Sequence, residues 1–332
     1  MRRAAVRGAI FAAVLLTALA ILVGFIGYER YGRPGPLGAP VVLIIDKGSG
    51  VARIAEQLES AGVIRNALLF RVGVRLEGRE SALKAGEYAF PAGISMRAVA
   101  ALLASGRTVR RRLTIAEGLT TRQALAVVAA ADGLIGTISR PVKEGGLLPE
   151  TYFFSWGDSR EGLVSRMEQA MHDALARIWA ERGDGLSVRS RKEALVLASL
   201  IEKETGKPEE RARISAVFHN RLRRGMRLQT DPTVVYAISG GSGPIDRPLT
   251  YGDLSIASPY NTYLKAGLPP GPIANPGVAS LVAAVNPAPV EDLYFVADGD
   301  GGHLFARTLE EHNRNVARWR QMQRERRTQG AR

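Results

Sequence analysis

The chain has 332 residues, 46% of them hydrophobic, which is enough for two domains that each bury a core. Its net charge of +13 sits mostly at the ends: residues 1–30 carry four Arg and one Glu, and residues 314–332 carry seven Arg and one Glu. The nearly neutral middle argues against nucleic-acid binding, and the absence of Cys excludes disulfides and thiol nucleophiles.

The N-terminal segment is predicted to be a membrane anchor. Residues 8–28 contain no charged side chain and are long enough to cross a bilayer. Arg2, Arg3 and Arg7 precede this segment, so the positive-inside rule predicts a cytoplasmic N-terminus and places the rest of the chain outside. A cleaved signal peptide would have a shorter apolar core and a small-residue cleavage site. We therefore expect residues 1–28 to form an uncleaved single-pass anchor.

A Gly- and Pro-rich linker over residues 29–40 leads to a small α/β unit over residues 41–108. Strands are predicted at residues 41–45 and 83–90, a helix with apolar positions at Val51, Ile54, Ala55 and Leu58, and a further helix capped by Ser95. The Gly48-Ser49-Gly50 turn followed by Ile54-Ala55 resembles a LysM-type glycan-binding module. A structural subdomain that touches no sugar is the alternative, and the sequence leaves both open.

Residues 109–319 are predicted to form a larger mixed α+β domain, so the fold class of the whole chain is α+β behind one transmembrane helix. A strand is expected at residues 109–115, helices at 122–130 and 163–179, and a last strand at 293–296. Long irregular segments between residues 226 and 289 hold most of the Pro and Gly residues, and loops of this kind often carry sites. Residues 320–332 form a basic tail.

Two carboxylates end an apolar helix in this domain. Residues 194–201 carry no charge, which predicts a buried helix, and Glu202 and Glu204 follow directly. Desolvation at such a position raises the pKa of a carboxyl group, and an acid that keeps its proton at neutral pH can protonate a leaving group. Helical spacing does not choose between the two. Pro208 and Gly225 mark the ends of a second helix, which brings two helices together near the carboxylates.

Several dense blocks resemble one known family, the endolytic murein transglycosylase (YceG-like) family, over about residues 41–319. They are Ala198-Ser199-Leu200-Ile201-Glu202-Lys203-Glu204-Thr205, Val217-Phe218-His219-Asn220-Arg221-Leu222, Gly225-Met226-Arg227-Leu228-Gln229-Thr230-Asp231-Pro232-Thr233, Ser258-Pro259-Tyr260-Asn261-Thr262-Tyr263, Gly267-Leu268-Pro269-Pro270-Gly271, Leu293-Tyr294-Phe295-Val296-Ala297 and Gly302-His303-Leu304-Phe305. One position departs from the family pattern: Glu150 follows Pro149 where Asp is expected, so the role of this acid stays open.

The resemblance implies a membrane-anchored lytic transglycosylase, a carbon–oxygen lyase that cleaves the MurNAc–GlcNAc β-1,4 bond within peptidoglycan strands and leaves 1,6-anhydroMurNAc ends. It implies an inner (plasma) membrane location with the catalytic domain in the periplasm, a glycan-strand substrate, cell-wall synthases as partners, and no cofactor. A two-carboxylate muramidase and a non-catalytic glycan-binding partner of the synthases are the alternatives.

The resemblance also assigns the site. It implies that Glu202, the first Glu of its block, is the catalytic acid. Asp231 and Glu150 are the candidates for a second carboxylate. The substrate-binding candidates are side chains that offer hydrogen bonds or flat rings to a sugar: Gln229, Thr230, Asp231, Tyr260, Asn261 and Tyr263. No metal site is expected, because the four His residues lack the spacing of metal ligands.

Overall fold

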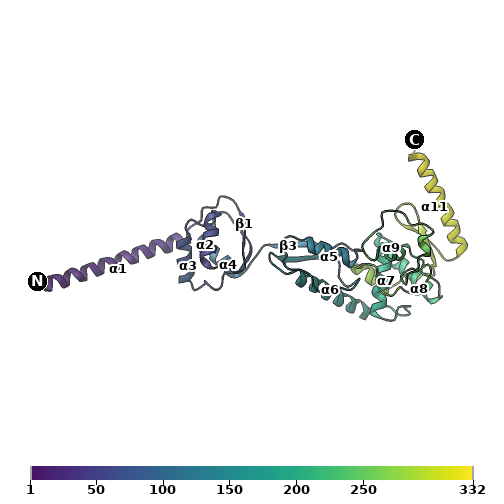
Figure 1. Cartoon of the computed structure of the whole chain (residues 1–332), viewed down its shortest axis with the longest axis horizontal. Helices are drawn as coiled ribbons and strands as arrows, with labels where there is room; N and C mark the ends of the chain where they lie inside the picture. Colours follow the sequence, from purple (N-terminus) through teal and green to yellow (C-terminus); the bar gives the residue numbers. More distant parts are fainter. Residues whose placement is uncertain (1, 331–332) are drawn as a thin grey trace. The chain divides into compact units, whose positions relative to one another are not determined.

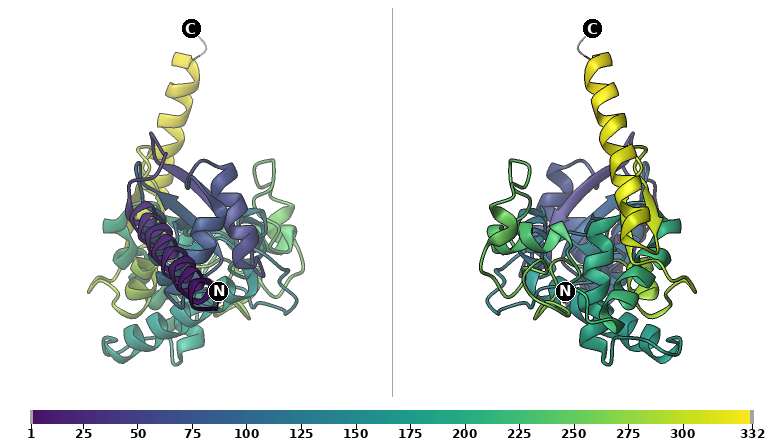
Figure 2. Two further views of the ribbon diagram at one scale, coloured as in Figure 1. Left: turned by 90° about the vertical axis from the view of Figure 1, so that its left-hand side faces the viewer. Right: turned by 90° about the vertical axis from the view of Figure 1, so that its right-hand side faces the viewer.

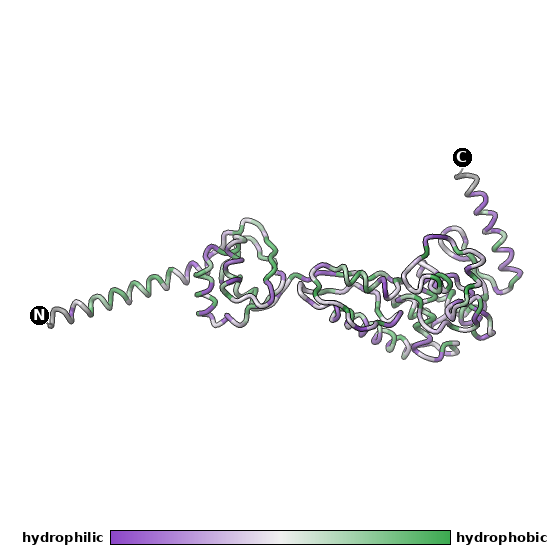
Figure 3. The backbone as a smooth tube through the Cα atoms, viewed as in Figure 1, coloured by the Kyte–Doolittle hydropathy of each residue, from purple (hydrophilic) through white to green (hydrophobic). Residues whose placement is uncertain are grey.

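The computed structural model describes residues 2–330, which form two compact units (Figure 1). One unit comprises residues 1–111 with residues 154–157, and the other comprises residues 112–153 with residues 158–332. The predicted α+β class with one N-terminal apolar helix is confirmed. Within the described residues, Ile10–Gly32 is the one helical stretch long and apolar enough to cross a membrane, and Figure 3 shows most of this helix in the hydrophobic colour.

The first unit begins with helix α1 (Arg2–Gly32) and continues through β1 (Val41–Ile45), α2 (Val51–Ser60), α3 (Ala67–Leu76), β2 (Gly86–Phe90) and α4 (Met96–Ser105). The two strands pair antiparallel with Val41 opposite Phe90 and Ile45 opposite Gly86. Their buried side chains pack against the helices around Leu58, Phe70 and Tyr88. Helix α3 was absent from the sequence prediction, because its Val, Phe and Gly residues are weak helix formers and only packing stabilises it.

The second unit contains all the blocks that resemble the family from Ala198 onward. Two strands, β3 (Arg110–Thr114) and β4 (Thr151–Ser155), have residues in both units. The other elements of the second unit are α5 (Thr121–Ala130), α6 (Arg160–Ala180), α7 (Arg191–Glu204), the 3-10 turn η1 (Pro208–Glu210), α8 (Arg211–Arg223), α9 (Asp231–Ser239), the 3-10 turn η2 (Asp253–Ser255), α10 (Val278–Val285), β5 (Tyr294–Ala297), β6 (His303–Ala306) and α11 (Leu309–Gly330). Strand β3 pairs with β4 and β5 pairs antiparallel with β6.

Helix α7 is the centre of the second unit. It packs against α6, α8 and α10, and its side chains from Val196 to Ile201 are buried. Two short helices, α9 and α10, lie in the stretch predicted to be irregular. They were not predicted because each has only eight or nine residues and begins or ends at Pro or Gly. The basic C-terminal segment continues α11, which projects from the rest of its unit (Figure 2).

Candidate active site

Both acidic side chains of interest lie in the last turn of α7. The Ser190 side chain caps the start of the helix by accepting from the Glu193 N–H at 3.2 Å. The Ser199 hydroxyl ties the middle of the helix to a loop, since it accepts from the Ile273 N–H at 3.1 Å. Glu202 and Glu204 are two residues apart, which is about 200° around a helix, so they face opposite sides.

Glu202 faces the start of α10. Its Oε2 accepts from the Gly277 N–H at 2.9 Å, and its Oε1 lies 3.9 Å from the guanidinium of Arg211. The side chain is 6% exposed. A carboxylate at the N-terminal amide of a helix is a favourable cap because it satisfies an amide that has no partner in the helix. The geometry therefore holds the Glu202 carboxylate at the start of α10 beside a guanidinium.

A second carboxylate, Glu117, lies beside Glu202. Its Oε2 is 3.8 Å from the same Arg211 guanidinium. Burial, and next the charge of Glu202, raise the pKa of the Glu117 carboxyl group. The Glu117 carboxylate also packs against Gly277, where a Cβ atom would lie 1.8 Å from Glu117 Oε1. A larger residue at this position would require the Glu117 side chain to rotate aside.

Glu204 faces a different part of the unit. The Thr230 hydroxyl donates a short hydrogen bond to its Oε1. The carboxyl group lines a hollow of about 460 Å³. The residues around this hollow come from α7, α8, the loop before α9, β5, β6 and α11, and they are Glu204, Arg221, Leu228, Gln229, Asp231, Tyr263, Phe295, Val296, Ala297, His303, His312 and Val316.

The environment of Glu204 favours its protonated form. Burial raises the pKa of the Glu204 carboxyl group from its ordinary value of 4.5 to about 7. The Thr230 hydrogen bond opposes this rise, and the charge of Asp231 adds to it. A carboxyl group with a pKa near 7 holds a proton at neutral pH and can both give it and take it back.

Asp231 and Tyr263 form a pair in the same hollow. The Tyr263 hydroxyl donates to Asp231 Oδ1 at 2.5 Å. Burial, and then this hydrogen bond, raise the pKa of the Tyr263 hydroxyl, so it stays protonated and keeps donating. The pair fixes a negatively charged group close enough to Glu204 to affect its pKa.

Gln229 lines the hollow with a strained backbone. Among the non-glycine residues that the structure describes, it alone has a positive φ, of 52°. Its N–H donates to the Thr262 carbonyl at 3.2 Å, which ties the loop before α9 to the loop that carries Tyr263. Backbone strain of this kind costs about 1–3 kcal/mol and gathers at functional sites.

Arg221 and His303 build the walls of the hollow. The Arg221 guanidinium is buried and donates to the carbonyls of Leu293 at 2.6 Å and Leu228 at 2.8 Å. The Glu210 carboxylate accepts from the His303 backbone N–H at 2.8 Å and lies 2.7 Å from the His303 Nδ1 atom. Arg221 therefore joins the end of α8 to β5, and His303 joins η1 to β6.

The structure brings only some of the predicted substrate-binding residues together. Gln229, Asp231 and Tyr263 line the hollow with Glu204, and Thr230 contacts the Glu204 carboxyl group. Asn261 is buried, and its amide donates to the Leu254 and Ile256 carbonyls, so it holds its own loop. Tyr260 packs against Tyr236 with ring centroids 4.8 Å apart and lies outside the lining of this hollow.

A second hollow of about 640 Å³ adjoins the first at Asp231, which lines both. Glu117, Lys203, Tyr236 and Leu249 are among its walls. Asp231 is the residue that these two hollows have in common. Glu150, the other candidate for a second carboxylate, is exposed, and its charge acts on Glu117.

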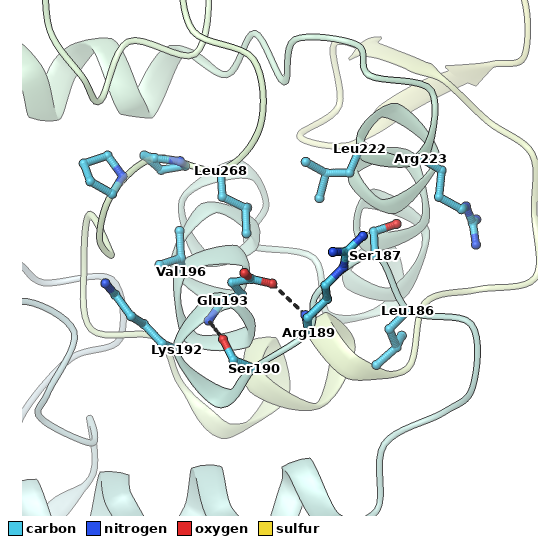
Figure 4. Close-up of a pocket in the computed structure, with 12 residues that line it drawn as sticks. Leu186, Ser187, Arg189, Ser190, Lys192, Glu193, Val196, Leu222, Arg223 and Leu268 are labelled. Carbon is cyan, nitrogen blue, oxygen red and sulfur yellow. Dashed lines mark hydrogen bonds between the residues drawn. The ribbon is translucent and has the colours of Figure 1, made fainter.

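A third hollow, of about 780 Å³, lies at the opposite end of α7 (Figure 4). Figure 4 shows Glu193 and Ser190 bonded to the backbone that starts the helix, where Glu193 Oε2 accepts from the Arg189 N–H at 2.6 Å. These polar groups are used in capping. Glu193, which lines this hollow, lies eleven residues before Glu204, about 17 Å along the helix.

Two of these residues, Glu117 and Arg221, were not among the predicted site residues, and His303 was considered only as an alternative acid/base residue, together with His219. Arg221 and His303 stand in blocks that resemble the family, but Glu117 stands in none, and its sequence pattern is that of an ordinary surface residue. The Gly277 position, which has no side chain, carried no signal for the contact with Glu117. Only long-range packing brings these residues to the end of α7.

Comparisons with known proteins identify the family. Residues 43–318 match the model of the YceG-like family. The chain is 34% identical over 304 residues to an endolytic murein transglycosylase of Bacillus subtilis, covering 81% of this chain and 82% of that protein. It is 31% identical to an endolytic murein transglycosylase of Streptococcus pneumoniae, covering 83% of this chain and 58% of that protein. A solved yceG-like protein from Listeria monocytogenes is 33% identical, with a TM-score of 0.50, over 83% of this chain and 98% of that one.

Proposed function

The chain belongs to the YceG-like family, and from this premise we propose that it is an endolytic lytic transglycosylase of peptidoglycan. Its substrate is the glycan strand, and the bond cleaved is the β-1,4 bond between MurNAc and GlcNAc. The family supports the reaction class, and the two hollows that share Asp231 support the polymeric substrate.

Glu204 is the proposed general acid. The observation that carries this assignment is its carboxyl group, with a pKa of about 7, in the hollow that also holds Asp231 and Tyr263. An acid with a pKa near the working pH is the most effective proton donor and acceptor. Glu202, which the family resemblance favours, instead accepts the Gly277 N–H and faces Arg211. The assignment to Glu202 stays a prediction that the same experiment tests.

The proposed reaction needs one acid and no water. Glu204 gives its proton to the glycosidic oxygen, the bond from C1 of MurNAc to that oxygen breaks, and GlcNAc leaves with a free 4-hydroxyl. The MurNAc 6-hydroxyl oxygen then bonds to C1 and returns its proton to Glu204, leaving a 1,6-anhydro end. The Asp231 carboxylate, which the Tyr263 hydroxyl orients, is the proposed group that stabilises the positive charge developing at C1.

The two hollows account for cleavage inside a strand. An endolytic enzyme must hold sugars on both sides of the bond it cuts, and the hollows on either side of Asp231 supply two such regions. Gln229 supplies hydrogen-bonding groups to one region, and Tyr236 supplies an apolar ring to the other. Asn261 and Tyr260 support the loop instead of contacting sugar.

A muramidase is the second candidate, because Asp231 is a second carboxylate in the same hollow. If Asp231 acted as a base toward water, the same bond would be hydrolysed and the product would be a reducing MurNAc end. Mass spectrometry of the fragments released from purified sacculi decides between the two. Anhydro ends support the transglycosylase, and products heavier by one water would overturn it.

The anchor places this reaction at a membrane. The apolar stretch Ile10–Gly32 is the proposed single-pass anchor in the inner membrane, with the N-terminus in the cytoplasm and the glycan site in the periplasm. A reporter that is active only outside the cytoplasm, fused after Arg332, should be active, and an inactive but stable fusion would contradict this topology. Cell-wall synthases, which work on the same strand, are the proposed partners.

A further inference from the structure

The first unit has an apolar stripe that faces away from its own core. Leu68, Val72 and Leu76 recur at every fourth residue of α3, so their side chains lie along one side of that helix. They are 66%, 45% and 83% exposed. Three large apolar side chains in one exposed row mark an interaction surface.

This stripe is held next to α1. Tyr31 of α1 is buried against Gly73 of α3, where a Cβ atom would lie 2.4 Å from the ring. Gly27 of α1 is similarly close to α3, because a Cβ atom there would lie 3.6 Å from the Leu69 side chain. Figure 1 shows α3 beside the end of α1, while β1 lies at the other side of the unit. The close packing through two glycines fixes α3 relative to the end of α1.

The two helices share a hollow of about 440 Å³. Val23 and Gly24 of α1 line it together with the three residues of the stripe. Val23 lies five residues before Tyr28, the last residue of the uncharged segment, and this is about 7.5 Å along a helix. Amphipathic helices at a membrane surface insert their apolar side to about this depth. The hollow therefore lies at the boundary of the apolar span.

The charges around the stripe suit a membrane surface. Arg71 and Arg75 are exposed on α3 beside the stripe, and Arg65 is exposed just before the helix. Arg30 and Arg33 are exposed at the end of α1. Glu77, the acid that lines the hollow, is paired with Arg79 at 3.2 Å and Arg97 at 3.4 Å. An apolar row bordered by Arg side chains complements acyl chains beneath anionic headgroups.

We propose that α3 is a membrane-surface helix, and that its stripe of Leu68, Val72 and Leu76 is occupied by lipid of the bilayer that α1 crosses. The stripe is continuous with the lipid-facing surface of α1, because Val23 and Gly24 line the same hollow. This inference rests on the proposed anchor. Binding of α3 to lipid would hold the first unit against the membrane surface, so that the unit is not attached through α1 alone.

The absence of cysteine allows a direct test in the full-length protein. Leu68→Cys, Val72→Cys and Leu76→Cys are each spin-labelled and reconstituted in vesicles of phosphatidylethanolamine and phosphatidylglycerol. Collision of the label with oxygen, which concentrates in lipid, is compared with collision with a water-soluble nickel chelate. Val42→Cys on β1, 53% exposed in the same unit, is the aqueous control, and Leu16→Cys in α1 is the control for the anchor.

Each outcome has one meaning. The proposal expects the three α3 labels to collide several-fold more with oxygen than with the chelate, whereas the Val42 label shows the reverse. If the α3 labels resemble Val42 while Leu16 lies deep in lipid, the proposal is overturned and the anchor stands. If Leu16 is also in water, the anchor itself fails. Labels protected from both reagents, or broadened until unlabelled protein is added, would mean that a protein or a second copy occupies the stripe, which also overturns the proposal.

Discussion

Replacing Glu204 with Gln tests the proposed acid and its environment at once. Gln keeps the shape of the side chain and can still accept the hydrogen bond from Thr230, but it carries no acidic proton. Losing a general acid should lower the rate of glycan cleavage by roughly 10²–10⁴-fold. Glu202→Gln is the matched control in the same turn of α7. It should retain most of its activity, because a Gln carbonyl can still accept the Gly277 N–H.

The same variant should change the pH dependence of stability. In the unfolded chain Glu204 loses its proton near pH 4.5, but in the folded protein only near pH 7. The folded state binds the proton more tightly, so the free energy of unfolding falls as the pH rises from 4.5 to 7. At about 1.4 kcal/mol for each tenfold change in proton affinity, the burial of Glu204 costs about 3 kcal/mol above pH 7. Glu204→Gln removes that cost.

Two measurements check this reasoning. Urea unfolding at pH 4 and pH 8 gives the free energy of unfolding of both proteins. The difference between Glu204→Gln and the wild type should increase by about 3 kcal/mol, in favour of the variant, from pH 4 to pH 8. The release of soluble fragments from sacculi should decline in the wild type above pH 7, because only the protonated acid can donate. Full activity in Glu204→Gln together with an inactive Glu202→Gln would refute the assignment and return the acid to Glu202. If the difference in the free energy of unfolding between variant and wild type is the same at pH 4 and pH 8, the Glu204 carboxyl group is not buried in its protonated form.

Three other changes test the surroundings of the site. Gln229→Gly should raise the free energy of unfolding by about 1 kcal/mol, because glycine adopts a φ of 52° without strain. It should also lower the rate of glycan cleavage if the Gln229 side chain contacts sugar. Urea unfolding and a fragment-release assay measure the two effects, and a lower free energy of unfolding would contradict the backbone strain. Gly277→Ala should change the free energy of unfolding by less than about 1 kcal/mol, because the Glu117 side chain that its Cβ would meet is 46% exposed and can rotate aside; a much larger loss than in Gly206→Ala, which has open space around it, would contradict this in the same unfolding assay. Deleting residues 41–105 should weaken binding to purified sacculi in a pull-down while the second unit stays folded, and unchanged binding would favour a structural role for the first unit.

The family and the reaction class could be predicted from sequence because they depend on local blocks of residues. The family resemblance is confirmed, as is the mixed α+β fold behind an apolar N-terminal helix. The apolar run before Glu202 predicted the buried helix α7, since a helix without a polar side must lie in a core. The LysM-like character of the first unit stays a prediction.

The family resemblance favoured Glu202, whereas the apolar run before the two acids could not by itself choose between them. Glu202 and Glu204 both follow the same apolar run, and only the partners from distant segments distinguish them. Gly277 and Arg211 meet Glu202, whereas Thr230 meets Glu204, and Asp231 and Tyr263 line the same hollow as Glu204. The sequence by itself determined that a carboxyl group would sit at the end of a buried helix. Only the tertiary structure supplies the partners of each carboxyl group, because the burial and charges that set the pKa of an acid come from other segments.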